Sequence, residues 1–135
     1  KMKLLVLHGP NMNLYGIRSY NEGKNITLDK INRYIRKYIR NKNVDIKIIQ
    51  THNESKIVSY LHSNRNKFDG MIFTPGIWCN SAHVLKDTLE IIKLPIVMIY
   101  LSKNENSKLF DSENSFYNDE IFLSFKQSID YYVSK

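Results

Sequence analysis

Leu4-Leu5-Val6-Leu7-His8-Gly9-Pro10-Asn11, near the amino terminus, is an apolar run that ends in residues favouring a turn. A short, continuous apolar run bounded by a turn signal is typical of a buried strand. The chain then continues as a loop that brings Arg18 beyond the end of this strand. Open α/β sheets place their ligand sites beyond the carboxyl ends of their strands. Residues 4–7 therefore predict a strand, and the Gly-Pro-Asn loop predicts part of a ligand site.

The remainder of the chain alternates between strand and helix patterns. Further strands are predicted at residues 44–49, 71–73 and 96–100, and helices at 28–39, 57–61 and 81–92. Thr27 is expected to cap the first of these helices. Strands that alternate with helices predict right-handed βαβ units and a parallel sheet. We therefore expect a single α/β domain over residues 1–135, a flavodoxin-like three-layer sandwich with a central parallel sheet.

The carboxyl-terminal quarter of the chain has a weaker pattern. Residues 102–118 are polar and predict an irregular loop with short turns. An apolar stripe then begins at Ile121 and predicts a final helix. The first residues of that stripe could instead form a short fifth strand, and the sequence leaves both alternatives open.

The composition is that of a globular protein, with 42% hydrophobic and 24% charged residues in a chain of 135. No apolar stretch approaches the ~20 residues of a membrane span, and the amino-terminal apolar run is too short for a secretion signal. The single cysteine, Cys79, excludes an internal disulfide and favours a cytoplasmic location. It precedes a helix near His83 and is either a reactive thiolate or, as we favour, an inert residue packed under Trp78.

The net charge of +7 raises the question of nucleic-acid binding. The densest basic group, between Arg33 and Lys42, lies along one predicted helix and its exit. Such a run is usually a solvated helix face, and the other basic residues are scattered from Lys1 to Lys135. A nucleic-acid-binding domain is therefore the third and least favoured function. The four histidines lack ligand spacing with acidic partners, so no metal is expected.

Six short motifs follow one another along the chain: Leu7-His8-Gly9-Pro10-Asn11-Met12-Asn13-Leu14, Gln50-Thr51-His52-Asn53-Glu54, Thr74-Pro75-Gly76, Leu85-Lys86-Asp87, Leu94-Pro95 and Leu101-Ser102. From Leu4 to about Phe110, their order and spacing resemble those of the type II 3-dehydroquinate dehydratases. This resemblance implies a lyase without a cofactor or metal, whose ligand is a small cyclic carboxylate. It also implies a homo-oligomer, either a trimer or a dodecamer.

The family removes water from a cyclic 3-keto acid through an enolate. The reaction needs a base, a group that stabilises the enolate oxygen, and an acid that protonates the leaving hydroxyl. In the family the base is a tyrosinate whose pKa is lowered by an arginine, an asparagine polarises the carbonyl, and a histidine supported by a glutamate is the acid.

Carried onto this sequence, the resemblance gives two sets of candidate site residues. The candidate catalytic residues are Asn11, Arg18, Tyr20, Thr74 and Tyr100. The candidate substrate-binding residues are Gly76, Asn80, Asp87, Leu101 and Ser102.

Several of these positions depart from the family pattern. The residue at the base position is Gly23, so Tyr20 or Tyr15 would have to replace the tyrosinate. Thr74 stands for the asparagine, Tyr100 for the histidine, Met98 for its glutamate partner, and Asn80 for a second histidine. The first hypothesis is therefore a dehydratase-like protein whose activity is reduced by these changes. The alternative is a non-catalytic homologue that binds a small molecule or serves in an assembly.

Overall fold

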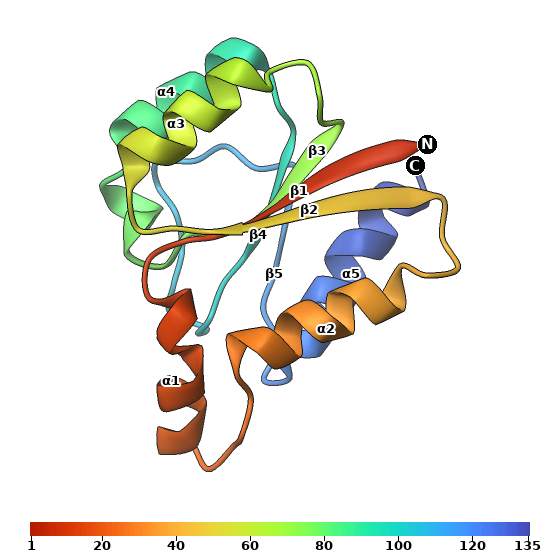
Figure 1. Ribbon diagram of the computed structural model, residues 1–135. Coiled ribbons are helices and arrows are strands. Elements are labelled where there is room, and N and C mark those ends of the chain that lie inside the picture. Colours follow the sequence, from red (N-terminus) through yellow and green to blue (C-terminus); the bar gives the residue numbers. More distant parts are fainter.

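The computed structural model describes residues 1–135 as an α/β sandwich in three layers (Figure 1). The central sheet contains five strands in the order β2-β1-β3-β4-β5, and every neighbouring pair is parallel. The strands are β1 (Met2–His8), β2 (Val44–Gln50), β3 (Gly70–Thr74), β4 (Ile96–Ile99) and β5 (Asn114–Phe116). The α-helices are α1 (Tyr15–Asn21), α2 (Leu28–Tyr38), α3 (Glu54–Ser63), α4 (His83–Ile92) and α5 (Ile121–Val133). The flavodoxin-like fold predicted from the sequence is confirmed.

The first strand lies inside the protein because both of its faces are covered by helices. Leu5 and Leu7 belong to the core under α3 and α4, whereas Leu4 and Val6 belong to the core under α2 and α5. All four side chains are fully buried. Strands of a doubly covered parallel sheet carry continuous apolar runs, which explains why the sequence showed this strand as an uninterrupted apolar segment.

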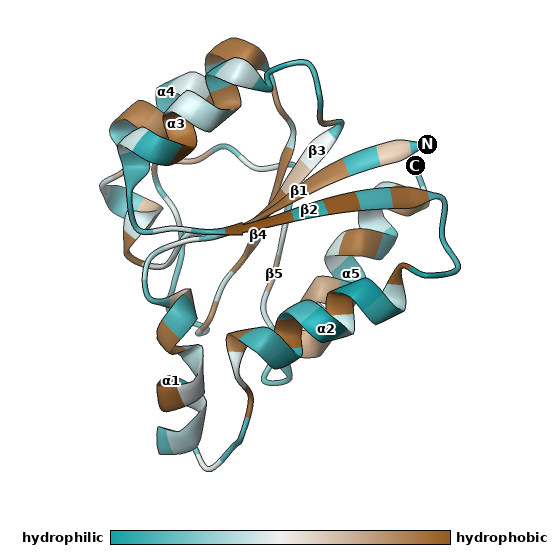
Figure 2. Ribbon diagram, viewed as in Figure 1, coloured by the Kyte–Doolittle hydropathy of each residue, from teal (hydrophilic) through white to brown (hydrophobic).

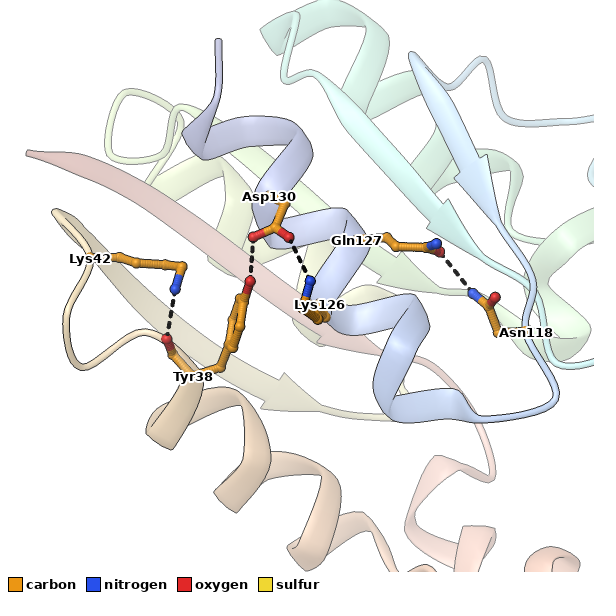
Figure 3. A network of polar contacts seen from close by, with 6 residues as sticks. All are labelled: Tyr38, Lys42, Asn118, Lys126, Gln127 and Asp130. Atoms are coloured by element: carbon orange, nitrogen blue, oxygen red, sulfur yellow. Dashed lines mark hydrogen bonds and ion pairs between the residues drawn. The ribbon is translucent and has the colours of Figure 1, made fainter.

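The helices α2 and α5 lie side by side on one face of the sheet and are joined by polar side chains at their surface. Figure 3 shows Tyr38 of α2, whose hydroxyl donates a hydrogen bond to Asp130 of α5 at 2.5 Å. Lys126 contacts the same carboxylate at 3.3 Å, and Lys42 lies 3.8 Å from the centroid of the Tyr38 ring. Hydrophilic residues predominate along α2 (Figure 2). Of the basic residues between Arg33 and Lys42, at least Lys42 therefore packs against another side chain, that of Tyr38.

Most of the predicted elements are confirmed. The Thr27 hydroxyl caps α2 by accepting a hydrogen bond from the Lys30 amide at 3.2 Å. The last apolar stripe is helical from Ile121 onward, so a fifth strand at its start was wrong. The fifth strand is Asn114–Phe116, inside the segment that the sequence predicted to be irregular. It is a short edge strand with two exposed polar residues, Asn114 and Ser115, and the half-buried Phe116. Its pairing with β4 rather than its own pattern makes it a strand.

The segment after β1 differs from the loop expected there. It forms a short 3₁₀ helix, η1 (Met12–Leu14), and then the helix α1. The helix is held by Ser19, whose hydroxyl donates to the carbonyl of Ile26 at 2.9 Å and accepts from the amide of the same residue at 2.8 Å. α1 lies apart from the three layers, beyond the carboxyl end of β1 (Figure 1). Its apolar residues Ile17 and Tyr20 face solvent, which is why no core-facing stripe marked it in the sequence.

None of the helices has both the length and the apolar character that crossing a bilayer would require.

Candidate functional site

A cavity of about 410 Å³ lies between the loop after β1, the helix α1 and the loops that follow β3 and β4. It is therefore at the carboxyl ends of the central strands, the position that the topology favours for a ligand. Its polar side chains are Asn11, Tyr15, Arg18, Asn21 and Glu105. Apolar walls are supplied by Pro10, Met12, Leu14, Ile17, Ile77 and Leu101. A volume of this size is within the range of small-molecule sites.

Two loops meet at the base of the cavity, and glycine permits their contact. The Gly9 amide donates a hydrogen bond to the Thr74 carbonyl at 2.9 Å. Asn11 and Gly76 both adopt left-handed backbone conformations, with φ of 69° and 56°. Asparagine and glycine tolerate this conformation better than other residues. The path of the backbone by itself therefore favours an asparagine at position 11 and a glycine at position 76.

Four of the ten candidate site residues line this cavity: Asn11, Arg18, Gly76 and Leu101. Arg18 reaches it from the last turn of α1, and Leu101 directly follows β4. The proximity of these residues depends on the parallel topology, because all three loops leave the same edge of the sheet.

The other six candidates lie outside the cavity. Thr74 is buried, and its hydroxyl lies 3.4 Å from both the Leu7 carbonyl and Nδ1 of His8. The Tyr100 hydroxyl accepts a hydrogen bond from the Ser107 amide at 3.2 Å, and burial raises the pKa of this tyrosine. The remaining four have exposed side chains: Tyr20, Asn80, Asp87 and Ser102.

Glu105 and Tyr15 are two further polar residues that line the cavity. Glu105 accepts a hydrogen bond from the Leu101 amide at 3.1 Å. Burial raises the pKa of the Glu105 carboxyl, and the Leu101 amide and Arg18 partly oppose that increase. Burial also raises the pKa of Tyr15, with Glu22 adding to the effect and Arg18 opposing it. No motif identified Glu105, because its role depends on how the polar loop after β4 folds back onto Leu101.

A buried histidine supports the base of the site. His8 Nε2 lies 2.9 Å from the Asn32 side-chain oxygen, and its ring packs edge-on against Phe125 with centroids 5.6 Å apart. Burial lowers the pKa of His8 to about 4, and the hydrogen bond with Asn32 only partly opposes this. His8 is consequently neutral at physiological pH, and its role is to hold the end of β1 in place. No three histidine, cysteine, aspartate or glutamate side chains converge to hold a metal ion.

Cys79 is expected to react slowly with iodoacetamide. The residue is buried in η2 (Gly76–Asn80), and burial raises the pKa of its thiol to about 11. Because the thiolate is the nucleophile, alkylation of the folded protein at pH 7.5 should be on the order of 100-fold slower than that of a free thiol of ordinary pKa. Mass spectrometry over time measures this rate, with the urea-unfolded protein as the control. Equal rates in the two states would contradict the assignment of an inert thiol.

The sheet order and the cavity at its carboxyl edge define this chain as a flavodoxin-like α/β domain with one small-molecule-sized cavity among its central loops. The sequence profile of the family described as dehydroquinase class II matches residues 2–120, and the chain belongs to this family.

Individual relatives agree with the family match. The chain is 37% identical over 101 residues to a 3-dehydroquinate dehydratase of Thermotoga neapolitana, covering 75% of this chain and 68% of that one. It is 31% identical over 113 residues to a 3-dehydroquinate dehydratase of Geotalea daltonii, covering 84% of this chain and 78% of the relative.

Solved structures share the fold. The type II dehydroquinase of Butyrivibrio crossotus superimposes with a TM-score of 0.82 and 23% identity, over 96% of each chain. A 3-dehydroquinate dehydratase-like protein from Bifidobacterium longum gives a TM-score of 0.74 and 14% identity, over 99% of this chain and 97% of its own.

Proposed function

We propose that this protein binds a small cyclic carboxylate of the 3-dehydroquinate type in the cavity beside α1, and that it does not dehydrate this ligand at the rate typical of the family. One observation carries the proposal. The cavity holds a cation, Arg18, and a carboxamide, Asn11, but no side chain suited to be the tyrosinate base. The site is thus equipped for anion binding more completely than for proton abstraction.

The available tyrosines support the absence of a base. Gly23 occupies the family's base position, in the turn after α1. Tyr20 is 76% exposed and does not line the cavity. Tyr15 does line it, but burial raises its pKa above the ordinary value of 10. A tyrosine with such a pKa is less than about 0.1% ionised at pH 7.

The groups that would stabilise the enolate and protonate the leaving hydroxyl are also displaced. The Thr74 hydroxyl lies within the sheet, and Tyr100 is bound to the Ser107 amide outside the cavity. Met98, at the position of the acid's supporting glutamate, is fully buried in the core and has no charge. Loss of one such polar group typically reduces an enzyme rate by about 10²–10³.

The ligand class follows from the shape and charge of the cavity. Arg18 and Asn11 offer donors to a carboxylate and to hydroxyl or keto oxygens. Met12 and Ile77 offer apolar surface to the carbon skeleton. The volume of about 410 Å³ accommodates a single substituted ring.

The proposal predicts that 3-dehydroquinate stabilises the purified protein without turnover. At ten times the dissociation constant, the ligand should raise the free energy of unfolding by about 1.4 kcal/mol, which a thermal-shift assay detects. Arg18→Ala should weaken binding roughly 10- to 100-fold, because a charge-assisted hydrogen bond contributes about 1.5–3 kcal/mol. Arg36→Ala, on the exposed side of α2, is the matched control.

Enone absorbance, measured in the same samples, follows formation of 3-dehydroshikimate. Turnover at the rate of an active family member would contradict the non-catalytic part of the proposal. Absence of any stabilisation, or equal binding by the Arg18 and Arg36 variants, would contradict the assigned site.

We also propose that the chain forms a homo-oligomer in the cytoplasm, as the family membership suggests. Leu14, Ile17 and Ile77 expose apolar surface around the mouth of the cavity, and such a cluster favours contact with another chain. Sedimentation velocity distinguishes a monomer, a trimer and a dodecamer.

A further inference from the structure

We propose that Glu105 is an internal competitor for the carboxylate of the ligand. It holds the Leu101 amide beside Arg18, so an anionic ligand must displace the Glu105 side chain to use that amide. This inference deepens the proposed function and rests on it, because it concerns how the same cavity controls its ligand.

The geometry at the end of β4 leaves the Leu101 amide without a backbone acceptor. The amide of the preceding residue, Tyr100, is paired with the Phe116 carbonyl of β5 at 2.9 Å. Leu101 therefore supplies the first amide beyond this pairing, and both Leu101 and Glu105 line the cavity. The amide is satisfied by Oε1 of Glu105 at 3.1 Å, within the same loop. A carboxylate from the chain itself thus occupies a donor at the wall of the cavity.

The charges around Glu105 leave this carboxylate incompletely compensated. Arg18, from α1, lines the same cavity and lowers the pKa of Glu105, but no direct ion pair joins the two side chains. The other titratable groups that interact with it are Cys79 of η2 and Tyr100, and burial raises the pKa of both. Both are therefore neutral at physiological pH, and Arg18 is the one cation that Glu105 and a ligand carboxylate would share.

Two consequences follow for an anionic ligand. At neutral pH the ligand carboxylate competes with Glu105 for the Leu101 amide and for Arg18. The two carboxylates carry like charges and repel each other. When the pH falls, Glu105 takes up a proton and becomes a poorer acceptor. Because its pKa is raised by burial, this occurs while much of a ligand with an ordinary carboxyl pKa is still ionised. Affinity for carboxylates should therefore increase on mild acidification and decrease once the ligand itself is protonated.

The test compares the wild-type protein with Glu105→Gln, which keeps the size of the side chain and removes its charge. Isothermal titration at pH 7.5 and at pH 5 uses 3-dehydroquinate, cyclohexanecarboxylate and the uncharged cyclohexanecarboxamide. Glu105→Gln should bind the two carboxylates about 10-fold more tightly at pH 7.5, with little change in affinity between the two pH values. Its affinity for the carboxamide should match that of the wild type. Glu90→Gln, an exposed glutamate on α4, is the matched control and should behave as the wild type.

Two outcomes would overturn the proposal that Glu105 competes with the ligand carboxylate. One is an equal affinity of wild type and Glu105→Gln for carboxylates at pH 7.5. The other is weaker binding by Glu105→Gln in a protein with an unchanged melting temperature, which would mean that Glu105 assists the ligand.

A second readout separates this inference from the proposed function. The amide resonance of Leu101, followed by NMR without ligand, should titrate with Glu105 in the wild type and lose this titration in Glu105→Gln. A Leu101 resonance that is indifferent to the Glu105 charge would overturn the inference. If neither protein bound any of the three probes, the proposed function would fail. A Leu101 amide that titrates with Glu105 would still support the hydrogen bond between this amide and the Glu105 carboxylate.

Discussion

Gly9→Ala is expected to lower the free energy of unfolding by about 3 kcal/mol, at the upper end of the usual cost of overpacking. A Cβ atom at Gly9 would lie 2.7 Å from the Thr74 carbonyl oxygen and 2.8 Å from that of Pro75. Both neighbours are backbone atoms, so no side chain can rotate to relieve the contact. The two loops would have to separate, at the expense of the hydrogen bond from the Gly9 amide to Thr74. Ligand affinity should decrease as well, because these loops carry Asn11 and Gly76 into the cavity.

Urea unfolding followed by circular dichroism measures the loss of stability, and the thermal-shift assay measures the loss of ligand binding. Gly16→Ala, within α1, is the matched control. Its new Cβ would meet the Cγ2 methyl of Thr27 at 3.2 Å, a side-chain contact that a shift of a few tenths of an ångström relieves, and alanine is favoured over glycine in a helix. Its stability should stay within about 1 kcal/mol of the wild type. Similar losses of stability in the two variants would show that the close approach of the two loops is not the reason why position 9 requires glycine.

Acidification from pH 7 to pH 4 is expected to cost the protein about 3 kcal/mol through His8 alone. Burial lowers the pKa of this histidine to about 4 from an ordinary value of 6.5. Above pH 6.5 both the folded and the unfolded chain carry a neutral His8, so the stability contribution is fully present. As the pH falls below 6.5, the unfolded chain binds a proton that the folded chain does not. Stability therefore decreases until the pH reaches the folded-state pKa near 4.

His8→Gln should remove this part of the pH dependence. The variant is destabilised at every pH, because it loses packing against Phe125, but its loss between pH 7 and pH 4 should be about 3 kcal/mol smaller than that of the wild type. Urea unfolding at four pH values measures the difference. His62→Gln, at an exposed position in α3, is the control and should keep the wild-type slope. A wild-type slope in His8→Gln would falsify the assignment of a neutral, buried histidine.

The central architecture could be predicted from local patterns. The run from Leu4 to Leu7 is apolar without interruption because helices cover both faces of its strand. Thr27 marked the start of α2 because a capping hydroxyl acts within one turn of the chain. The position of the cavity could be predicted from the Gly-Pro-Asn loop, because the loops that follow the carboxyl ends of parallel strands lie at one edge of the sheet.

Other elements lacked a local signal. The strand Asn114–Phe116 begins with two exposed polar residues, and its hydrogen bonds with β4 are made with a segment more than ten residues earlier in the chain. The helix α1 is held by the hydrogen bonds of Ser19 with Ile26 rather than by a buried stripe. A pattern based on side-chain periodicity does not register either kind of contact.

The sequence by itself determined the layer architecture, the family and the edge of the sheet at which the cavity lies. The layers and the edge depend on short-range apolar periodicity, on capping and on backbone conformations that only certain residues tolerate, whereas the family was indicated by the order and spacing of six short motifs. The tertiary structure alone decided which side chains share the cavity. It buried Thr74 against His8, turned Tyr100 toward Ser107, and brought Glu105 onto the Leu101 amide beside Arg18. Burial and charge at each position depend on distant segments packing together, and no residue's own neighbours in the chain encode them.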